Sequence, residues 1–162
     1  MADINSSDTE TVALIELLFF AYRDFVSDPD QLLKEIGFGR AHHRVVHFVG
    51  RDAGLTVAQL LEILGITKQS LGRVLKDLID QGYVYQKEGE HDRRQRLLYL
   101  TSQGEELRRK LIAPQIARIR RAVGESQHGA AHHYRAMLYH LVNPENRDAV
   151  RDWIEKNSVI GE

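Results

Sequence analysis

Two short helical segments separated by a glycine turn constrain the fold of this chain more than any other feature. The first begins at Thr56, which is followed three residues later by Gln59, the pattern of a capping box. Gly65 suits the left-handed position that ends this helix, and Thr67 can cap a second helix over residues 68–81. Two short helices joined by a tight turn that contains glycine form a helix-turn-helix.

The second of these helices has two different faces. Its apolar residues recur at the spacing of a buried stripe, namely Leu71, Val74, Leu75 and Leu78. The opposite face is polar and consists of Gln69, Ser70, Arg73, Lys76 and Asp77. Gln, Ser, Arg and Lys side chains can reach base edges or phosphates in a major groove. An ordinary solvated helix face has the same residue types, so this helix alone leaves both interpretations open.

A β-hairpin is predicted directly after this helix. Residues 83–87 and 97–100 are β-prone, and the segment between them is polar and dense in charge. An arginine on a thin hairpin is a suitable probe for a narrow, negative minor groove. Asp92 is expected to fix the tip by accepting hydrogen bonds from a neighbouring arginine or from hairpin amides. The simpler alternative is an exposed hairpin with ordinary charges.

Helical patterns flank this unit on both sides. They cover residues 9–27, 31–36 and 40–51 before it, and the chain after Thr101, with a kink expected at Pro114. These helices present more apolar surface than one small lobe can hide, so we expect a homodimer. The expected interface residues are Leu14, Leu17, Leu18, Phe25, Val150, Trp153 and Ile154.

The predicted fold class is therefore mainly α with a small β-hairpin wing (α+β). Residues 37–104 are expected to form a winged helix-turn-helix lobe. Residues 1–36 and 105–162 are expected to form a helical dimerisation domain. A two-fold dimer should prefer a pseudo-palindrome in DNA, with half-sites about 10 base pairs apart.

Composition removes several functional classes. The chain of 162 residues has no cysteine, which excludes disulfides, thiolate metal sites and cysteine nucleophiles. No apolar run is long enough to span a membrane, and the acidic, polar N-terminus is unlike a signal peptide, so a cytoplasmic protein is expected. No glycine-rich phosphate loop or catalytic constellation is recognisable, so neither an enzyme nor a cofactor is expected. The net charge of −1 still allows a basic patch on one face.

The histidines raise the hypothesis of a metal site. They include His42, His43, His47, His128, His132, His133 and His140. Two pairs stand four residues apart, but structural zinc normally takes four ligands and no tight motif supplies the rest. We therefore expect no metal site, and keep a metal-responsive regulator that uses histidines as an alternative.

The run from Asp92 to Thr101, followed by Gly104, resembles the wing signature of the MarR family of transcriptional regulators. The resemblance extends back through residues 67–70 and 82–84, and covers roughly residues 30–111. It implies a homodimeric regulator of double-stranded DNA, usually a ligand-responsive repressor. By position, Arg94 is the minor-groove arginine and Asp92 orients the tip. Gln86 departs from the pattern, because many relatives place an arginine there.

The resemblance assigns candidate residues to two sites. The DNA-binding candidates are Thr67, Lys68, Gln69, Ser70, Arg73, Lys76, Lys87, Asp92, Arg93, Arg94 and Arg96. Relatives often bind small anionic or aromatic ligands between the dimer helices and the winged lobe. Candidates for such an effector site are Tyr22, Arg40, His43 and Arg44. The remaining alternative is a winged-helix module that binds a protein instead of DNA.

Overall fold

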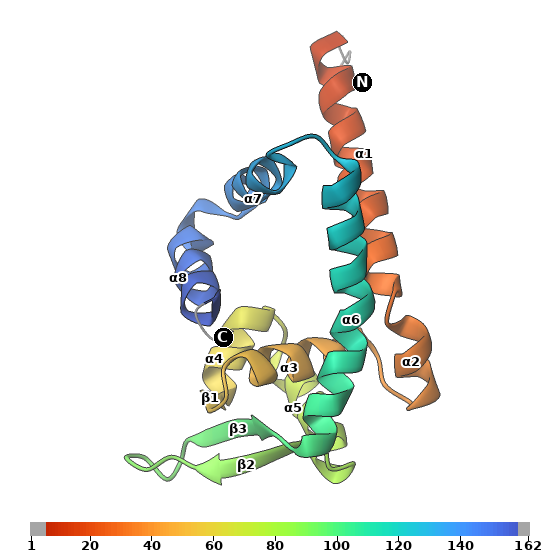
Figure 1. Ribbon diagram of the computed structural model, residues 1–162. Coiled ribbons are helices and arrows are strands. Elements are labelled where there is room, and N and C mark those ends of the chain that lie inside the picture. Colours follow the sequence, from red (N-terminus) through yellow and green to blue (C-terminus); the bar gives the residue numbers. More distant parts are fainter. Residues whose placement is uncertain (1–5, 159–162) are drawn as a thin grey trace.

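The structure, a computed structural model, describes residues 6–158. The helices are α1 (Ser6–Ser27), α2 (Asp30–Glu35), α3 (Arg40–Arg51), α4 (Val57–Leu64), α5 (Lys68–Asp80), α6 (Ser102–Glu125), α7 (Ala130–Leu141), the short 3-10 helix η1 (Pro144–Asn146) and α8 (Arg147–Ser158). The strands are β1 (Leu55–Thr56), β2 (Val84–Glu88) and β3 (Arg96–Leu100). Helices α3–α5 and the sheet form a lobe at one end, from which α1 and α6 extend, and α7 and α8 lead back towards it (Figure 1).

The helix-turn-helix is present as the sequence predicts. The side chain of Thr56 accepts a hydrogen bond from the amide of Gln59 (3.2 Å), and the Gln59 side chain accepts one in return from the amide of Thr56 (2.9 Å). Gly65 ends α4 with a φ of 60°, the left-handed conformation that favours glycine. The side chain of Thr67 then caps α5 by accepting from the amide of Ser70 (3.1 Å).

The lobe has one hydrophobic core. The predicted stripe of α5 is buried in full, and it packs with the buried valines of α3 and with Leu98 of β3. Helix α6 contributes Leu107 and Leu111 from its first half. The core therefore joins the helix-turn-helix to the beginning of α6.

The sheet is antiparallel, with strand order β1-β3-β2. Val84 pairs with Leu100 and Glu88 with Arg96, so the hairpin lies within one residue of the predicted strands. The two-residue strand β1 was not predicted, because two residues carry no recognisable alternation. The fold class is confirmed, with this third strand added.

The junction between the sheet and α6 depends on close backbone contact. Thr101 accepts a hydrogen bond from the amide of Gly104 (3.0 Å) and donates one to the carbonyl of Gly82 (2.6 Å). Gly104 lies directly against the carbonyl oxygen of Tyr83. Helix α6 continues through Pro114 as a single helix. Within residues 6–158, no helix is long and apolar enough to cross a membrane.

The C-terminal helix α8 returns to the lobe. The ring of Trp153 meets that of Phe48 of α3 edge-on, with centroids 5.5 Å apart. Lys156 pairs with Asp52 at 2.5 Å, and Arg51 donates to the main-chain carbonyl of residue 157 near the end of α8. A cation at a helix C-terminus is favourable, because the last carbonyls have no partner within the helix.

We predict that Gly104→Ala destabilises the protein. Its methyl group would collide with the Tyr83 carbonyl, which is backbone and cannot rotate away, at a cost of roughly 1–3 kcal/mol in the free energy of unfolding. Urea unfolding followed by circular dichroism measures this. Gly124→Ala is the matched control, because that glycine of the same helix has nothing within 4 Å. Equal stabilities for the two variants would contradict the prediction.

Candidate nucleic-acid interface and adjacent cavity

The outer face of α5 is exposed at every position predicted to contact DNA. Gln69 and Arg73 lie here beside Lys76, which forms an ion pair with Asp80 one turn later. This ion pair raises the pKa of Lys76 through the Asp80 carboxylate. Thr67 and Ser70 are engaged with each other through the helix cap (Oγ1 to Oγ, 2.9 Å). Their hydroxyls are therefore less available to an incoming phosphate than the longer side chains are.

A histidine bridge holds α5 against the start of α3. His42 Nε2 lies 3.1 Å from Asp77 Oδ2, and His42 Nδ1 accepts a hydrogen bond from the amide of Gly39 (3.1 Å). Because Nδ1 accepts, the proton of the neutral imidazole is on Nε2 and points at Asp77. The ring also stacks on Phe38, with centroids 4.5 Å apart. The sequence raised His42 as a possible metal ligand but did not favour that role, and its contact with Asp77 was not predicted.

The wing tip is organised by Asp92. Its Oδ1 accepts a hydrogen bond from the amide of Arg94 (2.9 Å), one of the contacts predicted for it. Arg96 donates to the carbonyl of Arg93 (3.1 Å) and pairs with Glu88 (3.3 Å). The guanidinium groups of Arg93 and Arg94 are exposed and have no ion-pair partner among residues 6–158. They are the free cations of the tip.

Lys87 lies over two tyrosines on the outer face of the hairpin. Its Nζ is 5.1 Å from the ring centroid of Tyr99 and 5.7 Å from that of Tyr85. The two rings stack across the strands at 5.4 Å. The contact between Lys87 and the two tyrosine rings was not predicted. The sequence did contain a sign of it, because Tyr85 and Lys87 are two residues apart and therefore lie on one face of the strand.

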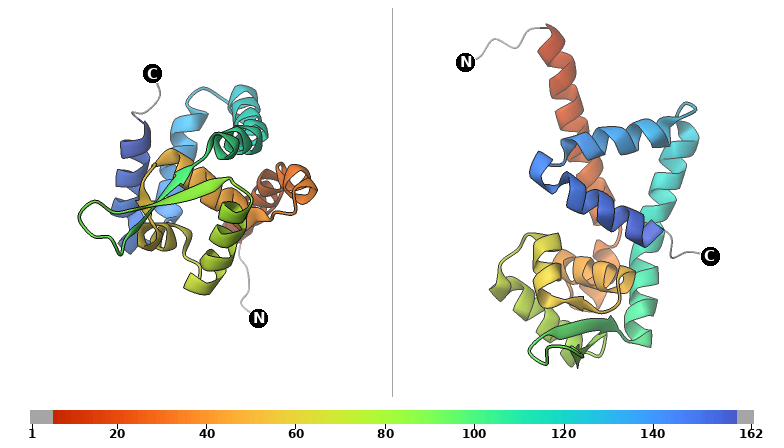
Figure 2. Two further views of the ribbon diagram at one scale, coloured as in Figure 1. Left: turned by 90° about the horizontal axis from the view of Figure 1, so that it is seen from below. Right: turned by 90° about the vertical axis from the view of Figure 1, so that its left-hand side faces the viewer.

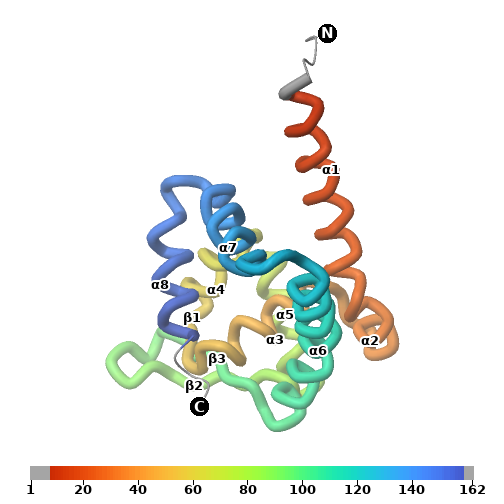
Figure 3. The backbone as a smooth tube through the Cα atoms, turned by 45° about the horizontal axis from the view of Figure 1, so that its top comes forward, coloured from red at the N-terminus to blue at the C-terminus, as the bar shows by residue number. Residues whose placement is uncertain are grey.

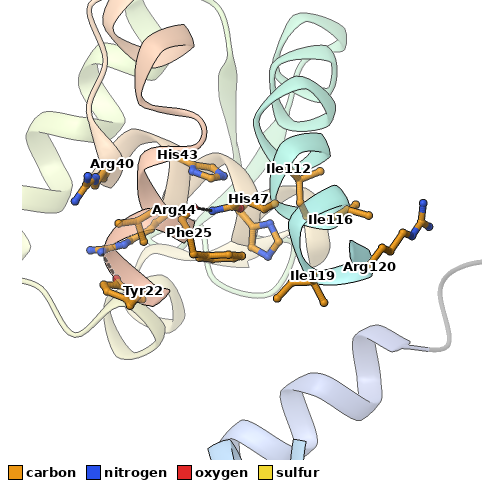
Figure 4. A pocket seen from close by; sticks show the side chains of 12 residues that line it. Tyr22, Phe25, Arg40, His43, Arg44, His47, Ile112, Ile116, Ile119 and Arg120 are labelled. Carbon is orange, nitrogen blue, oxygen red and sulfur yellow. Dashed lines mark hydrogen bonds between the residues drawn. The ribbon is translucent and has the colours of Figure 1, made fainter. Parts of the chain in front are cut away.

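A cavity of about 550 Å³ lies between α1, α3 and α6 (Figure 4). All four residues proposed for an effector site line it: Tyr22, Arg40, His43 and Arg44. The sequence interpretation missed His47 and the wall supplied by α6, which comprises Ile112, Gln115, Ile116, Ile119 and Arg120. These α6 residues lie more than sixty positions after α3 in the sequence, so no local pattern indicated that they share a cavity with it.

The charges around the cavity are unevenly compensated. Arg40 makes two hydrogen bonds to Asp30 (2.7 and 3.1 Å), which lower the pKa of that carboxyl group. Arg44 makes no ion pair within residues 6–158 and donates to the hydroxyl of Tyr22 (3.1 Å). The side chain of Arg120 extends away from the other lining residues (Figure 4). Arg44 and Arg120 are thus the cations of the cavity wall that have no ion-pair partner within residues 6–158.

Two histidines complete this wall in their neutral form. Burial lowers the pKa of His47 to about 4, with smaller contributions from neighbouring cationic groups. Burial also lowers the pKa of His43, and the charge of Arg44 adds to the effect. Within residues 6–158, no group of three His, Asp or Glu side chains is placed to hold a metal ion.

The predicted interface residues do not all have the same surroundings. Leu14, Leu17 and Leu18 of α1 are 54%, 62% and 48% exposed, and Ile154 of α8 is 49% exposed. By contrast, Trp153 packs on the lobe of its own chain, and Val150 is half-buried. Phe25 lines the cavity and also a second hollow between α1, α6 and α7.

Comparison with known proteins gives consistent matches. Residues 36–95 match the family model described as MarR family. The HTH-type transcriptional regulator PetP of Rhodobacter capsulatus is 42% identical over 156 residues, which cover 91% of this chain and 94% of that protein. The crystal structure of Streptococcus pneumoniae FabT in complex with DNA has a TM-score of 0.67 at 18% identity, over 83% of this chain and 94% of that one. S. aureus MepR in its DNA-binding conformation has a TM-score of 0.69 at 16% identity, over 80% and 96% respectively.

The low pKa of His47 predicts that acid destabilises the fold. Between about pH 6.5 and pH 4 the unfolded chain binds a proton at His47 that the folded chain does not bind, so the free energy of unfolding falls as the pH falls through this window. The loss is roughly 3 kcal/mol. Urea unfolding at several pH values between 4 and 7 measures it, and His47→Gln should flatten the dependence.

The control is His91→Gln, at an exposed position in the hairpin, which should keep the pH dependence of the wild type. The ion-paired carboxylates do not interfere. The pKa values of Asp28 and Asp30 are lowered from 3.8, so their stabilisation is lost only below that pH. An unchanged pH dependence in His47→Gln would refute the assignment.

Proposed function

Because this chain belongs to the MarR family of transcriptional regulators, we propose that it binds double-stranded DNA in a sequence-specific manner, as a homodimer. The observation that carries the proposal is the position of two basic elements on one end of the molecule. Helix α5 and the hairpin both lie in the part of the molecule away from the N-terminus of α1 (Figure 2), and the polar side chains of α5 and the arginines of the tip are exposed. A nearly neutral chain thus has a local basic surface.

In this proposal α5 enters the major groove and the wing enters the adjacent minor groove. Gln69 and Arg73 are long enough to reach base edges, and Lys76 and Lys87 meet phosphates. Arg94 enters the narrow groove, where the negative potential is strongest. The contact of Asp92 with the Arg94 amide supports this role. It fixes the conformation of the tip through the backbone, so the guanidinium group of Arg94 stays available to contact DNA. Residues 37–104 act as the DNA-binding lobe.

The helices outside the lobe supply the dimer interface. Helix α1 extends well beyond the lobe (Figure 3), and its apolar side chains are largely exposed. Exposed apolar side chains also follow α6 and α7, including Ile116, Ile119, Tyr134, Met137 and Leu141. A surface of this extent is unfavourable in water, and a second copy of the chain would cover it symmetrically. Residues 1–36 and 105–162 then form the dimerisation domain, and the paired lobes read a pseudo-palindromic operator.

The cavity beside α3 is the proposed effector site. It offers apolar walls from α1 and α6, two neutral histidines, and two arginines without ion-pair partners, Arg44 and Arg120. A ligand with an apolar or aromatic body and one anionic group fits this chemistry. Helix α3 connects the site to DNA binding, because its first turn also carries His42, which holds α5 through Asp77. We therefore favour a repressor that a small molecule releases, acting in the cytoplasm where its DNA is, with no enzymatic activity of its own.

Arg94→Ala tests the DNA-binding surface. Loss of a minor-groove arginine should weaken operator affinity by about 1–3 kcal/mol, or roughly 5- to 150-fold. Fluorescence anisotropy with a fragment selected from genomic DNA measures this. Arg109→Ala is the control, since Arg109 is an exposed arginine of α6 that pairs with Glu106 outside the lobe. Equal affinities for Arg94→Ala and Arg109→Ala would refute the role of the wing.

Leu17→Glu tests the dimer. A charge at this exposed apolar position would be buried twice in a symmetric interface, and should raise the dimer dissociation constant by roughly a hundredfold or more. Sedimentation velocity at micromolar concentration measures the monomer fraction. Ala58→Glu adds the same charge to the exposed surface of α4 and should remain a dimer. A Leu17→Glu variant that is still fully dimeric would place the interface elsewhere.

A further inference from the structure

Gly72 has an unusual position in the recognition helix. It lies in the middle of α5, three residues after Gln69 and four residues before Lys76, on the exposed face opposite the buried stripe. Glycine in the interior of a helix is unfavourable relative to alanine, because it loses more backbone freedom on folding. Gly72 therefore makes α5 less stable than alanine would, within the helix proposed to contact DNA.

No feature inside the described protein requires glycine at this position. Gly65 and Gly82 adopt positive φ values, where a side chain would be strained. Gly50 and Gly104 are pressed against neighbouring residues, so a side chain there would collide. Gly72 has neither reason. It does not have a positive φ, and a Cβ built on it would meet nothing within 4 Å.

The residues around Gly72 suggest why a side chain is absent at this position. Gln69 and Lys76 lie one turn before and after it on the same side of the helix, Arg73 follows it directly in the chain, and all three are exposed. A helix in the major groove reads base edges with side chains near its N-terminal half, which is where Gln69 and Arg73 lie. A glycine among them lets the helix backbone approach the base pairs, whereas a side chain there would act as a spacer.

We infer that Gly72 determines sequence specificity by setting how deeply α5 enters the major groove. This inference rests on the proposed DNA-binding function. It adds Gly72 to the residues that determine specificity, although glycine has no side chain with which to contact a base. With Gly72, Gln69 and Arg73 reach base edges at close range. A larger residue holds the helix away from the bases, so these two side chains lose their contacts while the phosphate contacts of the lysines persist.

The inference predicts opposite changes in stability and in specific DNA binding. Gly72→Ala should raise the melting temperature, because alanine is the better helix former and meets no clash. It should also lower operator affinity by roughly tenfold, about the cost of one disturbed base contact. Gly72→Leu should lower operator affinity further. Affinity for a random duplex should stay within about twofold of the wild type, since phosphate contacts dominate non-specific binding.

The experiment measures three quantities for each variant: the melting temperature, the affinity for the fragment that the wild type selects from genomic DNA, and the affinity for a random duplex of equal length. Gly124→Ala is the matched control, because it gives α6 the same helix-forming residue at an open position outside the lobe. It controls for the effect of the added methyl group on helix stability.

The possible outcomes separate this inference from the proposed function. If Gly72→Leu binds the selected fragment as tightly as the wild type, the inference is overturned while the DNA-binding function stands. If Gly72→Leu loses both affinities equally, Gly72 does not act through base contacts and the inference fails as well. If the wild type itself prefers no sequence, the proposed function fails at that point, before any variant is compared.

Discussion

The uneven distribution of buried apolar surface governs the rest of this structure. All of the core residues lie between Leu33 and Leu111, in the lobe or against it. Helices α1 and α7 contribute no buried side chain among the described residues, although α1 is among the most apolar segments of the chain. Hydrophobic burial is the dominant favourable term in folding, so the core stabilises the lobe, whereas α1 and α7 gain little from burial within the chain. Their exposed surface is the physical reason for proposing a dimer.

Helix α3 connects the functional parts, because each of its faces meets a different neighbour. Val45, Val46 and Val49 lie in the core and hold α5 and β3 in place. His43 and His47, four residues apart, face the cavity. His42 at the start of the helix holds Asp77 of α5. A ligand in the cavity and a DNA duplex on α5 would therefore both act on one short helix. A shift of that helix would be transmitted to α5 both through the core valines and through the His42–Asp77 bridge.

Much of the fold was predictable because it depends on local chemistry. The capping residues Thr56, Thr67 and Thr101 each make the expected hydrogen bond to a backbone amide three residues on. Gly65 and Gly82 end their helices in the left-handed conformation, which few other residues tolerate. The α5 stripe is buried at the spacing seen in the sequence. Strand β1 escaped prediction because its pairing with β3 joins segments about forty residues apart, which no local pattern records.

The candidate sites also contain some features that local sequence determines and others that depend on tertiary packing. The sequence by itself determined the helix-turn-helix, the hairpin with its arginine tip, and the residue types that face outward, because helix and strand periodicity and capping act over a few neighbouring positions. Only the tertiary structure decided which distant side chains meet: the wall that α6 gives to the cavity, the His42–Asp77 bridge, and the packing of Trp153 on Phe48. These contacts depend on how helices pack around the core. Packing is set by the fit of side chains far apart in the chain, and that fit has no local signature.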